Sequence, residues 1–143
     1  MFFRGGTRLF IISIHSFVDA YESGENITTA ELSRRHGYSS RAIFPTLSML
    51  IIAGIVKSQT GGIGQGYNLT RSPKDITIYD IVKATFPIPY MTCSLHDKTE
   101  DGDDCLLCSI TNDAISKLMT KYNAITLYDY AEILRNYDKN KRS

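Results

Sequence analysis

The chain has 143 residues, of which 43% are hydrophobic and 22% are charged, and its formal net charge is +1. These values are typical of a globular protein that is long enough to bury a core. No segment reaches the roughly 18 to 20 apolar residues of a membrane-spanning helix, so the sequence excludes a transmembrane protein, and we expect an intracellular, cytoplasmic one.

The first apolar segment, from Leu9 to Tyr21, has the residue spacing of a buried helix. Two arginines precede it, as in a signal peptide. However, polar residues at positions 13, 15 and 16 interrupt the apolar run, and no small-residue cleavage site follows. We therefore expect a helix that belongs to the core.

The next segment begins with a strong helix-start signal. Thr28 is an N-cap residue, and Glu31 stands three positions later, where it can complete a capping box. The helix is predicted from about Thr29 to His36. Gly37 can adopt the left-handed conformation that ends it.

A second helix follows after this short turn. Ser39 or Ser40 can cap it, and its apolar residues share one face: Ile43, Leu47, Leu50 and Ile51. Pro45 lacks the backbone donor of a helical residue, so we expect this helix to start late or to bend. Two capped helices joined by a glycine turn predict a helix-turn-helix.

The helix-turn-helix is followed by the pattern of a β-hairpin. Residues 55–59 and 66–69 have strand-like composition, and the glycine-rich residues 60–65 separate them. Together the two motifs predict a winged helix. The alternative is an αα-hairpin with a β-ribbon that has no role in nucleic-acid binding.

The charges are unevenly distributed. Residues 28–74 contain six lysines and arginines against one acid, a net charge of +5, whereas residues 75–107 have a net charge of −5. The basic block coincides with the predicted winged helix, where a phosphate-binding surface is required.

Three further helices are predicted after the hairpin. Thr77 caps a short helix that ends by Ala84, and apolar spacing from about Cys105 predicts a helix of four or five turns. Residues 126–134 form a last, shorter helix, before a frayed basic tail at residues 139–143. The apolar stripe of the long helix can pack against a second subunit or against the chain's own core, and the pattern alone leaves both open.

Residues 5 to 134 resemble the Rrf2 family of bacterial transcription regulators, which includes iron–sulfur sensors and nitric-oxide or redox sensors. The resemblance rests on segments that occur in the family's order: residues 27–39, 53–58, 64–69 and 73–82, the cysteine loop, and residues 126–129. It implies a mainly α fold with a small β-hairpin, a homodimer formed through the long helix, and two winged helices that bind a palindromic DNA site.

We expect three parts in the chain. Residues 1–85 are a winged helix-turn-helix domain, residues 86–108 a cysteine-containing sensor loop, and residues 109–143 the dimerisation helix and the C-terminal helix.

The candidate DNA-binding residues are polar side chains of the helix-turn-helix and the wing: Thr28, Ser39, Ser40, Arg41, Thr46, Lys57, Gln59 and Gln65. Arg41 supplies a guanidinium at the start of the recognition helix, where base edges are read. Family members usually carry an arginine at the start of the wing, where this chain has Gln59 and Thr60. The alternative function is therefore a dimeric module that binds an effector or partner and has a weakened DNA reader.

All three cysteines fall in one stretch with a histidine: Cys93, His96, Cys105 and Cys108. Four such donors at these spacings suit an iron–sulfur cluster, or zinc as the alternative. In the resembling family, three cysteines of a comparable loop hold a cluster of the [2Fe-2S] or [4Fe-4S] type, and His96 lies nearest the place of the missing one. A thiol switch between Cys93 and either later cysteine, and three inert cysteines without a cofactor, also remain open.

No enzymatic site is predicted. The glycines at 61, 62 and 64 lie between two strands instead of opening a helix, so they do not form a nucleotide-binding loop. A Cys–His pair has no evident oxyanion hole or orienting partner.

Overall fold

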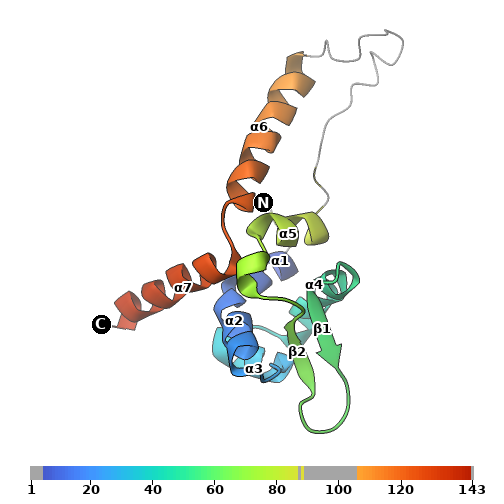
Figure 1. Ribbon diagram of the computed structural model, residues 1–143, viewed down its shortest axis with the longest axis vertical. Helices are drawn as coiled ribbons and strands as arrows, with labels where there is room; N and C mark the ends of the chain where they lie inside the picture. Colours follow the sequence, from blue (N-terminus) through green and yellow to red (C-terminus); the bar gives the residue numbers. More distant parts are fainter. Residues whose placement is uncertain (1–4, 87, 89–105, 143) are drawn as a thin grey trace.

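The computed structural model describes residues 5–86, 88 and 106–142 (Figure 1). Its elements are, in chain order, α1 (Gly5–Ile12), α2 (Ile14–Ser23), α3 (Thr29–His36), α4 (Ser40–Ile52), β1 (Val56–Gln59), β2 (Gly66–Leu69), the 3-10 turn η1 (Pro73–Asp75), α5 (Ile78–Thr85), α6 (Leu106–Asn123) and α7 (Leu127–Arg142). The mainly helical fold with a small hairpin agrees with the prediction. No described helix has both the length and the apolar character that a membrane crossing requires.

The single N-terminal helix predicted from Leu9 to Tyr21 is wrong, because two helices, α1 and α2, meet at Ser13. The hydroxyl of Ser13 donates to the carbonyl oxygen of Leu9 at 2.7 Å, a local bond that competes with the regular helical pattern. The apolar stripe continues across the break, since Phe10, Ile14 and Phe17 are all fully buried. The two helices therefore bury one continuous face.

The first helix of the helix-turn-helix is confirmed as α3. The hydroxyl oxygen of Thr28 accepts a hydrogen bond from the Glu31 backbone N–H at 3.1 Å, and Gly37 ends the helix at φ = 73°. The Glu31 carboxylate accepts a bond from Arg35 at 2.6 Å instead of returning to Thr28. In this described segment only half of the expected capping box is formed.

The recognition helix, α4, begins at Ser40 and continues through Pro45, so the expected late start is wrong. Pro45 is the sixth residue of the helix, and the helical bond it cannot make is the one to the Arg41 carbonyl, close to the helix start. The residues that follow anchor α4 in the core, because Leu47 and Leu50 are buried. This packing offsets the missing bond.

The predicted hairpin is confirmed as an antiparallel pair whose register runs from Val56 opposite Leu69 to Gln59 opposite Gly66. The segment before α3 adds a third line of backbone pairing, because Ile27 and Tyr67 exchange two backbone hydrogen bonds of 2.8 and 2.9 Å. This contact joins the wing to the entrance of the helix-turn-helix.

The core collects apolar residues from most of the described elements. α1 packs against α4, α2 against α7, and α5 against both α4 and α6. The predicted start of α5 is confirmed, since Thr77 and Asp80 bond each other's backbone N–H in a complete capping box.

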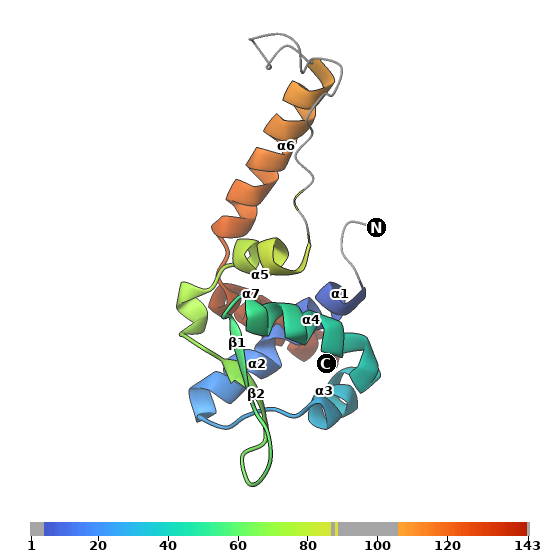
Figure 2. The ribbon, with the colours of Figure 1, turned by 90° about the vertical axis from the view of Figure 1, so that its right-hand side faces the viewer.

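The C-terminal helices leave the core in different ways. α6 extends away from the other elements in both views (Figures 1 and 2). α7 instead packs across α2, where Arg135 forms an ion pair with Asp19. The frayed tail expected after residue 138 is wrong, because α7 continues to Arg142, and the basic residues of its last turn suit the negative end of the helix dipole.

Candidate nucleic-acid interface

The start of α3, the recognition helix and the wing border one small groove. Its volume is about 150 Å³, and Thr28 and Thr29 line it from α3, Phe44 from α4, and Thr60 and Gln65 from the hairpin loop. These three elements therefore share one face of the molecule. Three of the predicted DNA-binding residues, Thr28, Gln59 and Gln65, line this groove. Ser39 caps α4 at its start.

The serines at the start of α4 already bond within the protein. The hydroxyl oxygen of Ser39 accepts a hydrogen bond from the Arg41 backbone N–H at 3.3 Å. The hydroxyl of Ser40 lies 3.1 Å from that of Ser33 on α3. Ser39 is exposed and Ser40 is half-buried. Each hydroxyl can therefore keep its bond within the protein and also contact a phosphate.

Arg41 is an exposed cation near the start of the recognition helix. It is exposed in the first turn of α4, and it makes no ion pair within the described part of the chain. Arg34 and Arg35 on α3 both lie near the Glu31 carboxylate, at 3.6 and 2.6 Å. Arg41 therefore needs to break no existing ion pair before it binds another group.

Thr46 is buried against α1. Its side chain is only 4% exposed and faces α1, where a Cβ placed on Gly6 would lie 2.1 Å from the Thr46 hydroxyl oxygen. This burial argues against a direct contact between Thr46 and DNA. Helical spacing alone does not show which side of α4 is covered by α1.

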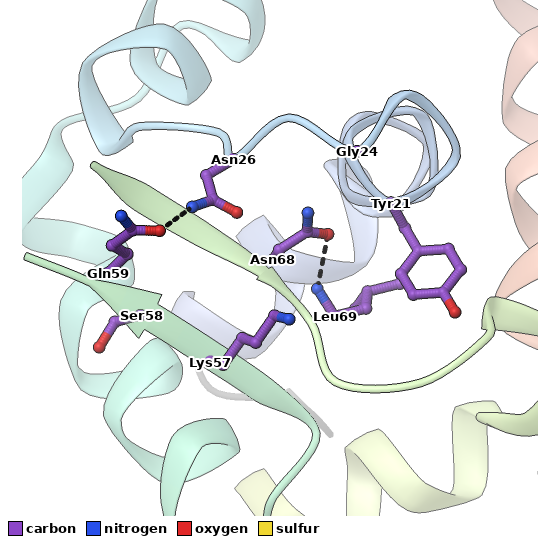
Figure 3. Close-up of a pocket in the computed structure, with 8 residues that line it drawn as sticks. All are labelled: Tyr21, Gly24, Asn26, Lys57, Ser58, Gln59, Asn68 and Leu69. Atoms are coloured by element: carbon purple, nitrogen blue, oxygen red, sulfur yellow. Dashed lines mark hydrogen bonds between the residues drawn. The ribbon is translucent and has the colours of Figure 1, made fainter. Parts of the chain in front are cut away.

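Lys57 and Gln59 line a second cavity, of about 550 Å³, between the hairpin and the end of α2 (Figure 3). The Asn68 side chain links β2 to the segment after α2. Its amide N–H donates to the Glu25 carbonyl oxygen at 3.3 Å, and its oxygen accepts from the Leu69 backbone N–H at 2.8 Å. Lys57 therefore lies on the strand face next to α2, and the α4 groove is not lined by it.

Asn26 braces the wing, a role that the sequence did not reveal. Its amide donates to the Gly64 carbonyl oxygen at 2.6 Å and to the Gln59 side-chain oxygen at 3.2 Å. The sequence around Asn26 does not distinguish it from the other polar residues of the linker. Its partner, Gly64, lies 38 residues away, so no local pattern connects the two.

A histidine fastens the helix-turn-helix to α2. The Nε2 atom of His36 lies 2.9 Å from the Ser16 hydroxyl, and the ring of His15 stands edge-on to it at 5.1 Å between centroids. Burial lowers the pKa of His36, and the nearby His15 and Arg35 lower it further, whereas Asp138 opposes the shift. The neutral imidazole is thus the form that the folded state favours.

Three of the four predicted metal ligands, Cys93, His96 and Cys105, lie outside the described residues. Cys108 is half-buried in the first turn of α6. Within residues 5–86, 88 and 106–142, no three histidine, cysteine, aspartate or glutamate side chains form a group that could hold a metal ion.

Comparison with known proteins gives a consistent result. Residues 7–133 match the family model Rrf2, described as an iron-dependent transcriptional regulator. A curated protein of Rhodobacter capsulatus, described as an HTH-type, rrf2-like transcriptional regulator, is 30% identical over 93 residues, which are 62% of this chain and 61% of that protein. The chain thus matches less than two thirds of that relative's length.

Solved structures share the fold. IscR of T. potens superposes with a TM-score of 0.68 at 19% identity, covering 96% of this chain and 88% of that one. CymR, the global cysteine regulator of B. subtilis, superposes with a TM-score of 0.68 at 22% identity, covering 93% and 98%. At these identities the likeness concerns the fold alone.

Proposed function

The chain belongs to the Rrf2 family of transcriptional regulators, which are not enzymes, and we propose that it is a homodimeric transcription regulator that binds a palindromic DNA site. The observation that carries this proposal is the groove that the start of α3, the recognition helix and the wing share. The block of residues that builds this face has a net charge of +5, which suits a polyanion.

DNA contact is proposed for the residues that the fold leaves accessible. Arg41 is free of ion pairs within the described residues and stands at the start of the recognition helix, where a bidentate guanidinium reads guanine. Thr28, Ser39, Ser40 and the glutamines of the wing supply hydrogen bonds to phosphates.

The surface of α6 supports the homodimer. Its first five residues include three large apolar side chains that are exposed to solvent: Leu106, Leu107 and Ile110 are 72%, 71% and 57% exposed. Such a patch on a projecting helix marks a protein contact, and a two-fold axis lets the same helix cover it. Two subunits would then present two recognition helices to two half-sites.

For the cysteine segment we propose a sensing role. Three thiols and an imidazole are donors that fit an iron–sulfur cluster, so Cys93, Cys105, Cys108 and His96 would hold it. A cluster, when bound, supplies a group that responds to iron supply and redox state. Cys108 stands on α6, the proposed dimer helix, so a change at this residue acts directly on the element that sets the spacing of the two readers.

The DNA-binding proposal is tested by selecting duplexes from a random pool with the purified protein and footprinting the selected sequence. We expect a two-fold symmetric footprint of two half-sites, one to two helical turns apart, with two chains per duplex. Failure to enrich any sequence, together with no retention of the pool at low salt, would refute it.

The sensing proposal is tested by iron, acid-labile sulfide and zinc analysis of protein purified without oxygen. Iron and sulfide near stoichiometry, lost in a Cys108→Ser variant, support the cluster. Zinc alone would make the segment a structural site. Protein without metal would refute the cluster and leave thiol chemistry or inert cysteines.

A further inference from the structure

The tip of the wing carries one large side chain. Ile63 stands between Gly62 and Gly64, and its relative exposure is 103%. Among the large apolar side chains of the described residues it is the most exposed, ahead of Ile52 at 87%. The fold makes no use of this side chain.

The tip is thin and uncharged. Gly61, Gly62 and Gly64 have positive φ angles of 77°, 77° and 88°, so the loop turns without side chains on either side of Ile63. Residues 58–66 contain no charged residue. A single side chain at such a tip can enter the minor groove of B-DNA, which is about 6 Å wide. A neutral tip, by contrast, gains little from a phosphate.

The tip is also held in place. Asn26 donates to the Gly64 carbonyl oxygen at 2.6 Å, and the backbone bonds between Ile27 and Tyr67 fix the base of the hairpin. A loop that is already ordered loses less conformational entropy when it binds.

The hairpin loop that carries the tip lies across one groove from α4. Phe44 of α4 and Thr60 and Gln65 of the hairpin loop face each other across one groove. On B-DNA the major and minor grooves lie on the two sides of each phosphate strand. With α4 in the major groove and a phosphate strand in this protein groove, the wing tip reaches the adjacent minor groove.

We infer that Ile63 enters the minor groove next to α4 and selects base pairs that lack the guanine 2-amino group. This inference rests on the proposed DNA-binding function. Aliphatic side chains are the type that minor-groove proteins insert. The guanine amino group projects from the groove floor, and the sec-butyl group of an isoleucine over it removes its water without offering an acceptor.

The test compares duplexes of alternating inosine and cytosine with duplexes of alternating guanine and cytosine of the same length. The two present the same groups in the major groove and differ by the amino group in the minor groove. Dissociation constants are measured for the wild type, for Ile63→Ser and for the matched control Ile52→Ser, which removes another highly exposed isoleucine, at the far end of α4 from Arg41.

We expect the wild type and Ile52→Ser to prefer the inosine duplex by about tenfold, and Ile63→Ser to lose the preference while keeping its melting temperature. Equal binding of both duplexes by the wild type, or a preference that survives in Ile63→Ser, would overturn the inference and leave the proposed function intact. No binding of either duplex would overturn both. A change of oligomeric state in Ile63→Ser, without a change of duplex preference, would assign the tip to a protein contact and overturn the inference.

Discussion

At the scale of single residues, the face shared by α3, α4 and the wing has two kinds of polar side chain. Some already bond within the protein, and others remain available for binding. Ser39 and Ser40 already bond within the helix-turn-helix, and Thr46 is buried against α1. Arg41 makes no ion pair within the described residues and is exposed. An exposed cation that makes no ion pair contributes little to stability, so we assign Arg41 a role in binding DNA.

His36 makes the stability of the folded chain depend on pH. Its pKa lies below the ordinary value of 6.5, first because of burial and then because of His15 and Arg35. Below pH 6.5 the unfolded chain therefore takes up a proton that the folded chain resists, so stability is full above pH 6.5 and falls as pH drops toward the lowered pKa of His36. We expect the melting temperature to fall as the pH drops below about 6.5, and to fall less in His36→Gln.

Thermal unfolding followed by circular dichroism at a series of pH values measures this difference. The glutamine keeps a hydrogen-bonding group opposite Ser16 but cannot be protonated in this range. An unchanged pH dependence in His36→Gln would show that other groups are responsible.

At the scale of elements, the wing is defined by its contact with the segment before α3. Gly66 lies where β2 meets Ile27, and a Cβ there would come within 2.7 Å of the Ile27 carbonyl oxygen. Gly62 also has a positive φ, of 77°, but nothing lies within 4 Å of a Cβ placed on it. Replacing each glycine by alanine therefore distinguishes the cost of a left-handed backbone, at Gly62, from the added cost of a steric clash, at Gly66.

We expect Gly62→Ala to lower the free energy of unfolding by about 1 kcal/mol, the cost of a left-handed alanine. Gly66→Ala adds a clash with backbone atoms that cannot rotate away, so we expect a loss of about 3 kcal/mol or more. Urea titrations of both variants measure the difference. Equal losses would mean that the Ile27 contact is easily displaced.

The elements also show what the sequence could and could not reveal. Local signals were sufficient where one residue type sets the backbone: Thr28 and Thr77 cap α3 and α5 as predicted, and Gly37 ends α3. The same reasoning failed where distant residues decide. α7 extends to Arg142 while Arg135 bonds Asp19, which lies 116 residues away in sequence.

The candidate site was partly predictable for the same reason. The charge and the turn residues of the helix-turn-helix are local features, and they indicate a DNA-binding motif from the sequence alone. Thr46 faces Gly6 because α1 packs across α4 at that point. No local sequence pattern predicts how these two helices cross. The brace from Asn26 to Gly64 likewise depends on where the folded linker meets the wing.

At the scale of the whole molecule, α6 sets the spacing of the two recognition helices in the homodimer that we propose. Its exposed stripe has no cover among the described residues, while α5 packs against the helix elsewhere. Ile110 is 57% exposed in the single chain, so a charge there is tolerated by the folded monomer but not by a buried dimer interface.

We therefore expect Ile110→Glu to convert a dimer into a monomer, with a shift to the mass of one chain in sedimentation equilibrium. The matched control, Ile52→Glu, changes an exposed isoleucine on α4 and should remain dimeric. A monomeric wild type, or a dimeric Ile110→Glu, would contradict the proposed interface.

The central claim, that the shared face of α3, α4 and the wing binds DNA, is tested most directly by the dissociation constant for a selected duplex as a function of salt. We expect log K against log salt to have a slope of about −4 or steeper, since each neutralised phosphate contributes about −0.9. Arg41→Ala should weaken binding by about 1–3 kcal/mol per base contact, whereas the control Arg142→Ala, at the end of α7, should not. A flat salt dependence, with Arg41→Ala indistinguishable from the wild type, would contradict the account and favour a module that binds an effector or a protein partner.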